Sequence, residues 1–157
     1  MPSVLFVCTA NRFRSPLASA FFKNELDQNS AAAQWTVDSA GTWAERGLPP
    51  LPEASLIARK YDLDLTRHRS KPVTASLLTA QDLILVMEAG QREALQNEFP
   101  AIGGRVHLLS WAAERRNYDI PDTIHSLDAM LEVSAVLHDL IHKGFSNICE
   151  LAAQFHR

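Results

Sequence analysis

The chain begins with a short run of apolar residues. Positions 3–7 read SVLFV, a continuous β-branched and aromatic run that is typical of a strand buried on both faces. Three more segments have the character of strands: 35–39 (WTVDS), 82–87 (DLILVM) and 105–109 (RVHLL). The pattern therefore predicts a sheet of four short strands.

Helical periodicity separates these strands. Apolar residues recur every three or four positions from Leu17 to Leu26. Ser15 and Pro16 are typical of the start of this helix, because serine caps free amides and proline suits the first turn. Further helices are predicted at 51–60, 89–97, 126–142 and 145–155. Gly144 marks a break or kink between the last two.

Strands and helices alternate at intervals that suit βαβ units, which predicts an α/β protein. We expect one three-layer domain over residues 1–157, with a four-stranded parallel sheet and helices on both faces, because 157 residues is a common size for one domain. The stretch 113–126 is charged, contains a proline and has no clear period. It predicts a long surface loop after the fourth strand.

Composition narrows the classes of function. Apolar residues make up 46% of the chain and charged residues 21%, which excludes a disordered protein. The net charge of -3 does not favour a nucleic-acid partner. No apolar run is long enough for a membrane span or a signal peptide, so we expect a cytoplasmic protein with no membrane partner. Cys8 and Cys149 are too far apart in sequence to suggest a zinc site or disulfide framework, and an intracellular thiol stays reduced.

The candidate chemistry lies in residues 8–15 (CTANRFRS), between the first strand and the first helix. In open α/β sheets ligands bind beyond the carboxyl ends of the strands, and a strand-loop-helix turn aims backbone amides at one point, where it can hold phosphate without a metal. The helix dipole and Arg14 would stabilise the thiolate of Cys8, which is a nucleophile. Arg14 can donate two hydrogen bonds to phosphoryl oxygens, and Ser15 can donate one to the sulfur.

The spacing of Cys8 and Arg14 alone is a weak signal, and an inert buried cysteine is the alternative. The preceding strand, the Ser-Pro helix start and Asn11 add weight to the functional interpretation. Asn11 tolerates the left-handed backbone that such a loop needs.

The segment VCTANRFRSPLASAFF (7–22) resembles the VC-x-x-N-x-x-RSP-x-A-E opening of the low-molecular-weight protein tyrosine phosphatases, with Ser19 in place of the glutamate. The resemblance continues through VDSAGT (37–42), the pair at 68–69, DLILVME (82–88) and DIPD (119–122). It spans nearly the whole chain, which is identified as a bacterial-type member of that family. The resemblance implies the same fold, with a phosphate-binding loop between the first strand and first helix.

The resemblance also implies a mechanism that needs no metal or cofactor. Cys8 attacks phosphorus and forms a phosphocysteine, which water hydrolyses, while Arg14 and the loop amides stabilise the transition states. Asp122 matches the family's general acid. Asp119 in the same loop is the rival, and the family register favours Asp122. Either aspartate could instead cap the helix that opens near Ser126.

Further roles follow from the resemblance. It assigns phosphate or substrate binding to Thr9, Ala10, Asn11, Arg12, Phe13 and Ser15. Trp43 would form a wall of the substrate pocket, although an ordinary packed tryptophan is the alternative. Ser39 and His68 match a supporting hydrogen-bond network, although His68 alone would suggest a surface histidine.

Arg12 hints at an acidic substrate, and a solvated arginine explains it equally well. The pair of histidines at 138 and 142 predicts a solvated helix face rather than a metal site.

Besides Ser19, four positions depart from the family pattern. Thr123 replaces the proline expected after the acid, which could loosen the loop. Ile124 and His125 stand where the family has aromatic residues that enclose a phosphotyrosine ring. Phe13 stands where many members carry a second loop cysteine, so that thiol is missing here.

Three functions remain open on the sequence. The first is an enzyme that hydrolyses phosphotyrosine or other aryl phosphate monoesters, with a phosphorylated protein or a small aryl phosphate as its partner. The second is a phosphate-binding module that has lost efficient turnover. The third is an arsenate reductase, which in this fold uses further cysteines to resolve its adduct, and Cys149 is the one other thiol in the chain.

Overall fold

Four parallel strands in the order β2-β1-β3-β4 form the sheet. The strands of this computed structural model, which describes residues 1–156, are β1 (Ser3–Cys8), β2 (Thr36–Gly41), β3 (Leu83–Val86) and β4 (Val106–Leu108). The chain runs from β1 outward to β2, then returns to β3 and continues outward to β4. The strand order therefore reverses between β1 and β3, which is where ligands bind in open α/β sheets.

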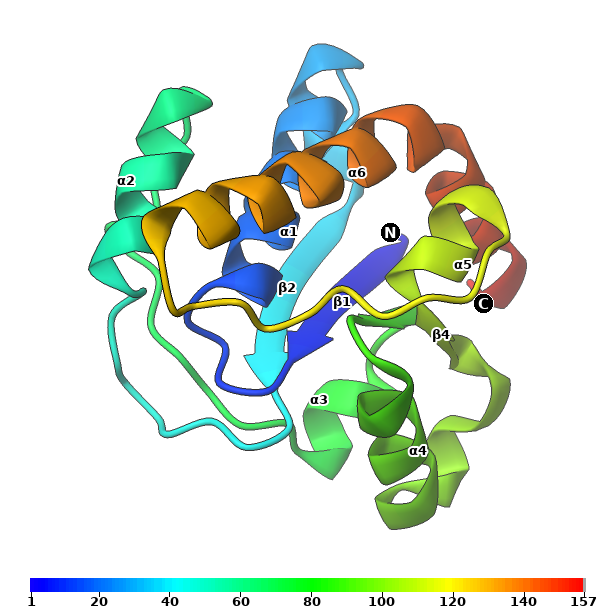
Figure 1. Cartoon of the computed structure of the whole chain (residues 1–157). Helices are drawn as coiled ribbons and strands as arrows, with labels where there is room; N and C mark the ends of the chain where they lie inside the picture. The colour runs from blue at the N-terminus through cyan, green and yellow to red at the C-terminus, as the bar shows by residue number, and fades with distance from the viewer. Residues whose placement is uncertain (157) are drawn as a thin grey trace.

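Helices cover both faces of the sheet, as the alternation of strands and helices predicts (Figure 1). On one face lie α1 (Arg14–Gln28), α2 (Pro52–Lys60), α5 (Leu109–Glu114) and α6 (Leu127–Phe155). On the other lie α3 (Ala75–Thr79), α4 (Ala89–Glu98) and the 3-10 helix η2 (Pro100–Arg105), while η1 (Ala32–Gln34) precedes β2. Alternate residues of β1 point to the two faces: Val4 and Phe6 to the first, Leu5 and Val7 to the second. The three-layer α/β architecture is confirmed.

Several boundaries differ from the sequence prediction. The first helix begins at Arg14, and its N-cap residue is Phe13, which makes no capping side-chain bond. The prediction that Ser15 caps this helix is therefore wrong. The short helices α3 and α5 were not predicted, and α5 reduces the long loop from 113–126 to 115–126. Both helices are too short to show a clear hydrophobic period.

The predicted break at Gly144 is also wrong, because α6 runs without interruption from Leu127 to Phe155. Gly144 is buried where α5 packs on α6, and a Cβ atom there would lie 2.5 Å from the Cβ of Ala113. The glycine therefore serves the close approach of two helices and not a bend.

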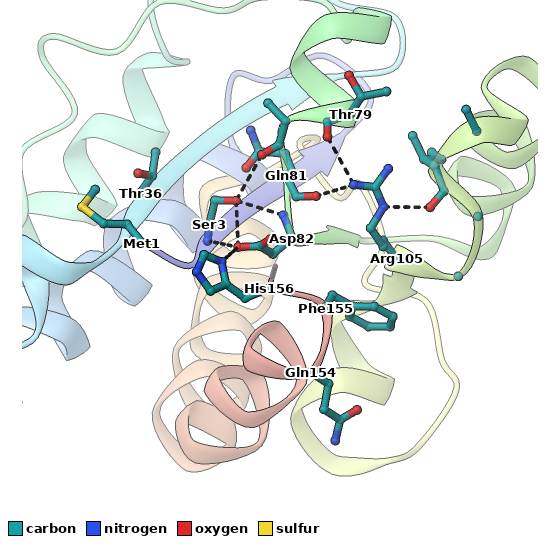
Figure 2. Close-up of a pocket in the computed structure, with 15 residues that line it drawn as sticks. Met1, Ser3, Thr36, Thr79, Gln81, Asp82, Arg105, Gln154, Phe155 and His156 are labelled. Atoms are coloured by element: carbon teal, nitrogen blue, oxygen red, sulfur yellow. Dashed lines mark hydrogen bonds and ion pairs between the residues drawn. The ribbon is translucent and has the colours of Figure 1, made fainter.

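A groove of about 840 Å³ lies where the strands begin, at the edge of the sheet opposite to the Cys8 loop (Figure 2). Its polar groups bond to one another. Asp82 Oδ2 accepts a hydrogen bond from the Ser3 amide at 2.9 Å and lies 2.9 Å from Nδ1 of His156. Arg105 donates to the backbone carbonyls of three residues, Thr79, Gln81 and Ile102. These contacts fasten the end of α6 and the η2 segment to the strands.

Within residues 1–156, none of the helices combines the length and the apolar character that crossing a bilayer would need. The domain boundary at residue 157 stays a prediction, since Arg157 lies outside the described residues.

Candidate active site

Asn11 shapes the loop that follows β1. Its φ of 59° places it in the left-handed region, which asparagine tolerates better than most residues. The buried Asn11 side chain donates from Nδ2 to Ser15 Oγ at 2.8 Å and to Ser39 Oγ at 3.0 Å. Its Oδ1 accepts from the Lys71 amide at 3.1 Å. One side chain thus joins the loop to α1, to β2 and to the segment before α3.

His68 holds the same loop through its backbone. Nε2 of His68 lies 2.7 Å from the carbonyl oxygen of Asn11, and because a carbonyl only accepts, this nitrogen carries the proton. Burial lowers the pKa of His68 below its ordinary value of 6.5, and the bond to Asn11 opposes that shift. The ring is therefore neutral at pH 7, and His68 is not an isolated surface residue.

Cys8 ends β1 beneath this loop and is only 3% exposed. Its Sγ lies 2.9 Å from Ser15 Oγ. Ser15 Oγ accepts from Asn11, so its one proton can be donated to the sulfur or to the Ala40 carbonyl at 3.4 Å, and the sulfur is the nearer of the two. This explains why Ser15 is not a helix cap: its hydroxyl is used by Cys8.

The end of β2 runs along the Cys8 loop. The amides of Thr42 and Trp43 donate to the carbonyls of Cys8 and Thr9, both at 2.9 Å. Gly41 permits this approach, because a Cβ at that position would collide with the carbonyl oxygen of Thr9. The contact places Trp43 beside the loop.

Arg14 lies at the same edge and is 2% exposed. Its Nη1 donates to Glu88 Oε2 at 2.9 Å and to the carbonyl of Ile120 at 2.7 Å, while its Nε lies 3.7 Å from Asp122 Oδ1. Glu88 had no role in the sequence interpretation. The signal was present in the sequence, since an acidic residue directly after a buried strand lies at the edge of the sheet where the first strand also ends.

The two rival aspartates have different surroundings. The carboxylate of Asp122 lies near Arg14 and is 45% exposed, so it can reach a ligand. Asp119 Oδ1 instead accepts from the Ala89 amide, the first of α4, at 2.8 Å. The alternative that either aspartate caps α6 is wrong, because Ser126 Oγ accepts the Ala129 amide there.

The rim of the site is formed by residues from three segments. Trp43 is 86% exposed, so the alternative of an ordinary packed tryptophan is wrong. Arg12 donates from Nε to the carbonyl of Pro49 at 2.9 Å, and among residues 1–156 no carboxylate lies within ion-pair distance of it. Ile124 is exposed on the segment 115–126, which carries Asp119 and Asp122 and is called the acid loop below. The rim therefore presents an aromatic ring and an unpaired positive charge.

Other predicted residues lie as follows. The Phe13 side chain is buried in the hydrophobic core, so residue 13 can contact an anion only through its backbone. Ala10 is exposed on the loop. Thr123 does not leave the acid loop untethered, because its Oγ1 donates to the Ala129 carbonyl at 3.3 Å.

The two histidines of α6 lie on a solvated face, as predicted, with side chains 40% (His138) and 59% (His142) exposed, but each also contacts a neighbouring helix. The ring of His138 stacks on Tyr61 of α2, with centroids 5.0 Å apart. His142 Nδ1 lies 2.6 Å from Oε1 of the buried Glu25 of α1. Both residues therefore take part in helix packing. No cluster of three or more potential metal ligands is found in the described part of the chain.

The geometry defines a class of protein: an α/β fold in which a cysteine, an arginine and a carboxylate lie at the loop that joins the first strand to the first helix. The model of one family, low molecular weight phosphotyrosine protein phosphatase, matches residues 3–151, and the chain belongs to that family.

Individual relatives agree with this membership. The probable low molecular weight protein-tyrosine-phosphatase EpsP of Ralstonia nicotianae is 36% identical over 76% of this chain and 77% of the relative. The structure of Wzb from Vibrio vulnificus in complex with benzylphosphonate is 28% identical, covers 98% of each chain and has a TM-score of 0.78. A structure of YwlE arginine phosphatase with a phosphorylated active-site serine shares the fold, with a TM-score of 0.89 at 24% identity over 98% of this chain and 99% of the other.

Proposed function

We propose that this protein hydrolyses aryl phosphate monoesters, including phosphotyrosine in proteins, through a phosphocysteine at Cys8. The observation that carries the proposal is the convergence of three groups at the carboxyl edge of the sheet. Cys8 ends β1 with its sulfur bonded by Ser15, and the Nε of Arg14 lies 3.7 Å from a carboxylate oxygen of Asp122. These groups suffice for nucleophilic attack, charge stabilisation and proton transfer.

In the first step the Cys8 thiolate attacks phosphorus, and the bond to the aryl oxygen breaks. Asp122 gives its proton to that oxygen, so the product leaves as a phenol. Nη1 of Arg14 is occupied by Glu88 and Ile120, which leaves Nε and Nη2 to donate to two phosphoryl oxygens. The backbone amides of residues 9–13 supply the remaining donors.

In the second step a water molecule attacks the phosphocysteine. The Asp122 carboxylate accepts a proton from this water, the bond between sulfur and phosphorus breaks, and inorganic phosphate forms. The Ser15 hydroxyl keeps its proton and donates a hydrogen bond to the Cys8 thiolate as it departs. Asn11, Ser39 and His68 keep the loop in one conformation through both steps.

The two alternative functions have less support. A phosphate-binding module without turnover would be favoured by a loosened acid loop, but Thr123 ties that loop to α6. Arsenate reduction would need a second reactive thiol. Burial raises the pKa of Cys149 to about 11, so its thiolate is scarce at neutral pH. A cytoplasmic location and a phosphorylated protein partner remain predictions from the sequence.

Replacing the proposed general acid tests the mechanism directly. Asp122→Ala should lower kcat for p-nitrophenyl phosphate by about 10² to 10⁴-fold, because the leaving oxygen and the attacking water lose their proton partner. Asp139→Asn, which removes an exposed carboxylate from α6, is the matched control and should keep wild-type activity. Steady-state assays decide the question, and an Asp122→Ala enzyme that is as fast as wild type would remove Asp122 from the mechanism.

The unpaired charge of Arg12 predicts a preference for acidic substrates. Wild type should hydrolyse a phosphotyrosine peptide with flanking glutamates about 3 to 10 times more efficiently than a neutral peptide, and added salt should weaken this preference. Arg12→Gln should abolish the preference, while Arg59→Gln, at the exposed end of α2, should preserve it. The measurement is kcat/KM for both peptides, and an unchanged ratio in Arg12→Gln would show that Arg12 is merely solvated.

A further inference from the structure

The turn formed by the end of β3 and the first residues of α4 (residues 87–91) lies against the Cys8 loop, because β1 and β3 are adjacent at the point where the strand order reverses. Gln91, which is buried, stiffens this turn: its Oε1 accepts the amides of Met87 at 2.9 Å and Glu88 at 3.0 Å. Its Nε2 donates to Thr9 Oγ1 at 3.0 Å and to Glu88 Oε2 at 3.1 Å. The turn is thus bonded directly to the Cys8 loop.

The acid loop is bonded to the same turn. Asp119 Oδ1 accepts the Ala89 amide at 2.8 Å, and the Ile120 amide donates to the Met87 carbonyl at 2.8 Å. The Ile120 carbonyl accepts from Nη1 of Arg14 at 2.7 Å. Asp122 follows only two residues later, after a proline whose ring restricts the backbone. The position of the Asp122 carboxylate therefore depends on how the chain is fixed at Asp119 and Ile120.

We propose that Asp119 is a positioning residue, which anchors the acid loop to the first amide of α4 and so holds Asp122 beside the leaving oxygen. The proposal rests on the proposed function, in which Asp122 is the general acid. The Ala89 amide is one of the free donors at the positive end of α4, so it binds an acceptor well, and a carboxylate best of all. Ile120 is held by its backbone bonds and by its side chain, which is buried in the core. Asp119 supplies the side-chain hydrogen bond to α4, and a substitution can remove this bond without opening the core.

Two substitutions separate positioning from proton donation. Asp119→Ala removes the acceptor of the Ala89 amide, whereas Asp119→Asn keeps an oxygen that can accept this bond but cannot act as an acid. Asp122→Asn is the reference variant, and Asp139→Asn is the control for loss of a surface charge. Each protein is assayed with phenyl phosphate and with p-nitrophenyl phosphate, whose leaving group needs less help from an acid. Competitive inhibition by inorganic phosphate reports on the Cys8 loop and Arg14.

We expect Asp119→Ala to lower kcat about tenfold for phenyl phosphate and less than about threefold for p-nitrophenyl phosphate, since a misplaced acid costs most where the leaving group is poor. Asp119→Asn should stay within about threefold of wild type on both substrates. Phosphate inhibition should change less than about twofold in both variants, because Glu88 still holds Arg14.

Each other outcome overturns the proposal in a recognisable way. If Asp119→Asn is as slow as Asp119→Ala, then Asp119 transfers the proton itself. If Asp119→Ala slows both substrates equally, or weakens phosphate inhibition in parallel, its role is general folding of the site. If Asp122→Asn shows no dependence on the leaving group, the assignment of the acid in the proposed function fails as well, which distinguishes that failure from failure of the positioning role alone.

Discussion

Cys8→Ser is expected to lower turnover of p-nitrophenyl phosphate at least about 10⁴-fold, the largest effect of any single substitution in this protein. A serine hydroxyl at this position is a much poorer nucleophile than a thiolate, and the side chain bonded to residue 8, Ser15, is itself a hydroxyl and cannot act as its base. The replacement is nearly isosteric, so the bonds that shape the loop should persist.

Binding of inorganic phosphate, measured by calorimetry, checks that the Cys8→Ser site is intact and should change by less than about tenfold. Cys149→Ser is the matched control. This residue is half-buried on α6, away from the loop, and its substitution should leave turnover at the wild-type rate. Retention of more than about a tenth of the activity by Cys8→Ser would contradict a covalent mechanism at this cysteine.

Arg14→Lys is expected to reduce kcat/KM about 10³-fold, the second largest effect. Arg14 has two roles: Nη1 is bonded to Glu88 and to the Ile120 carbonyl, which leaves Nε and Nη2 as the proposed donors to the phosphoryl group. A lysine ammonium is one nitrogen atom with three donors. It therefore cannot bind Glu88 and also donate two coplanar hydrogen bonds to phosphoryl oxygens. The formal charge is kept, which isolates the geometry as the cause.

Two measurements accompany this prediction. Inhibition by phosphate should weaken about 10 to 100-fold in Arg14→Lys, because the same donors bind the product. Arg67→Lys, an exposed arginine before His68, is the control and should behave as wild type. An Arg14→Lys enzyme with normal phosphate inhibition would show that the guanidinium does not touch the phosphoryl group.

Part of the fold could be predicted because the sequence patterns that indicate it lie within short stretches of neighbouring residues. The run VLFV (4–7) is apolar at every position, and four strand-like segments separated by helical patterns predict a parallel sheet with two covered faces. The ends of the helices were harder to predict from the sequence. Glycine in a helix usually weakens it, so Gly144 suggests a break, but the sequence does not show that Ala113 packs against this position.

The candidate site also has one part that the sequence predicted and another that only the structure revealed. The Cys8 loop and its left-handed Asn11 follow from one continuous segment together with the family resemblance. Glu88 and Gln91 were missed because their partners, Arg14 and Thr9, are more than seventy positions away. Only the pairing of β1 with β3 brings these side chains together.

By itself, the sequence determined the layered α/β architecture, the loop that carries Cys8 and Arg14, and the family of the chain. These features rest on periodicity and on residues adjacent along the chain, where the chemistry of each residue constrains its neighbours directly. The tertiary structure alone decided that Ser15 serves the sulfur and not a helix end, that Asp119 binds α4 while Asp122 lies near Arg14, and that α6 is unbroken. Each of these depends on which distant group lies within hydrogen-bond or van der Waals distance, a property of the packed chain that no local pattern encodes.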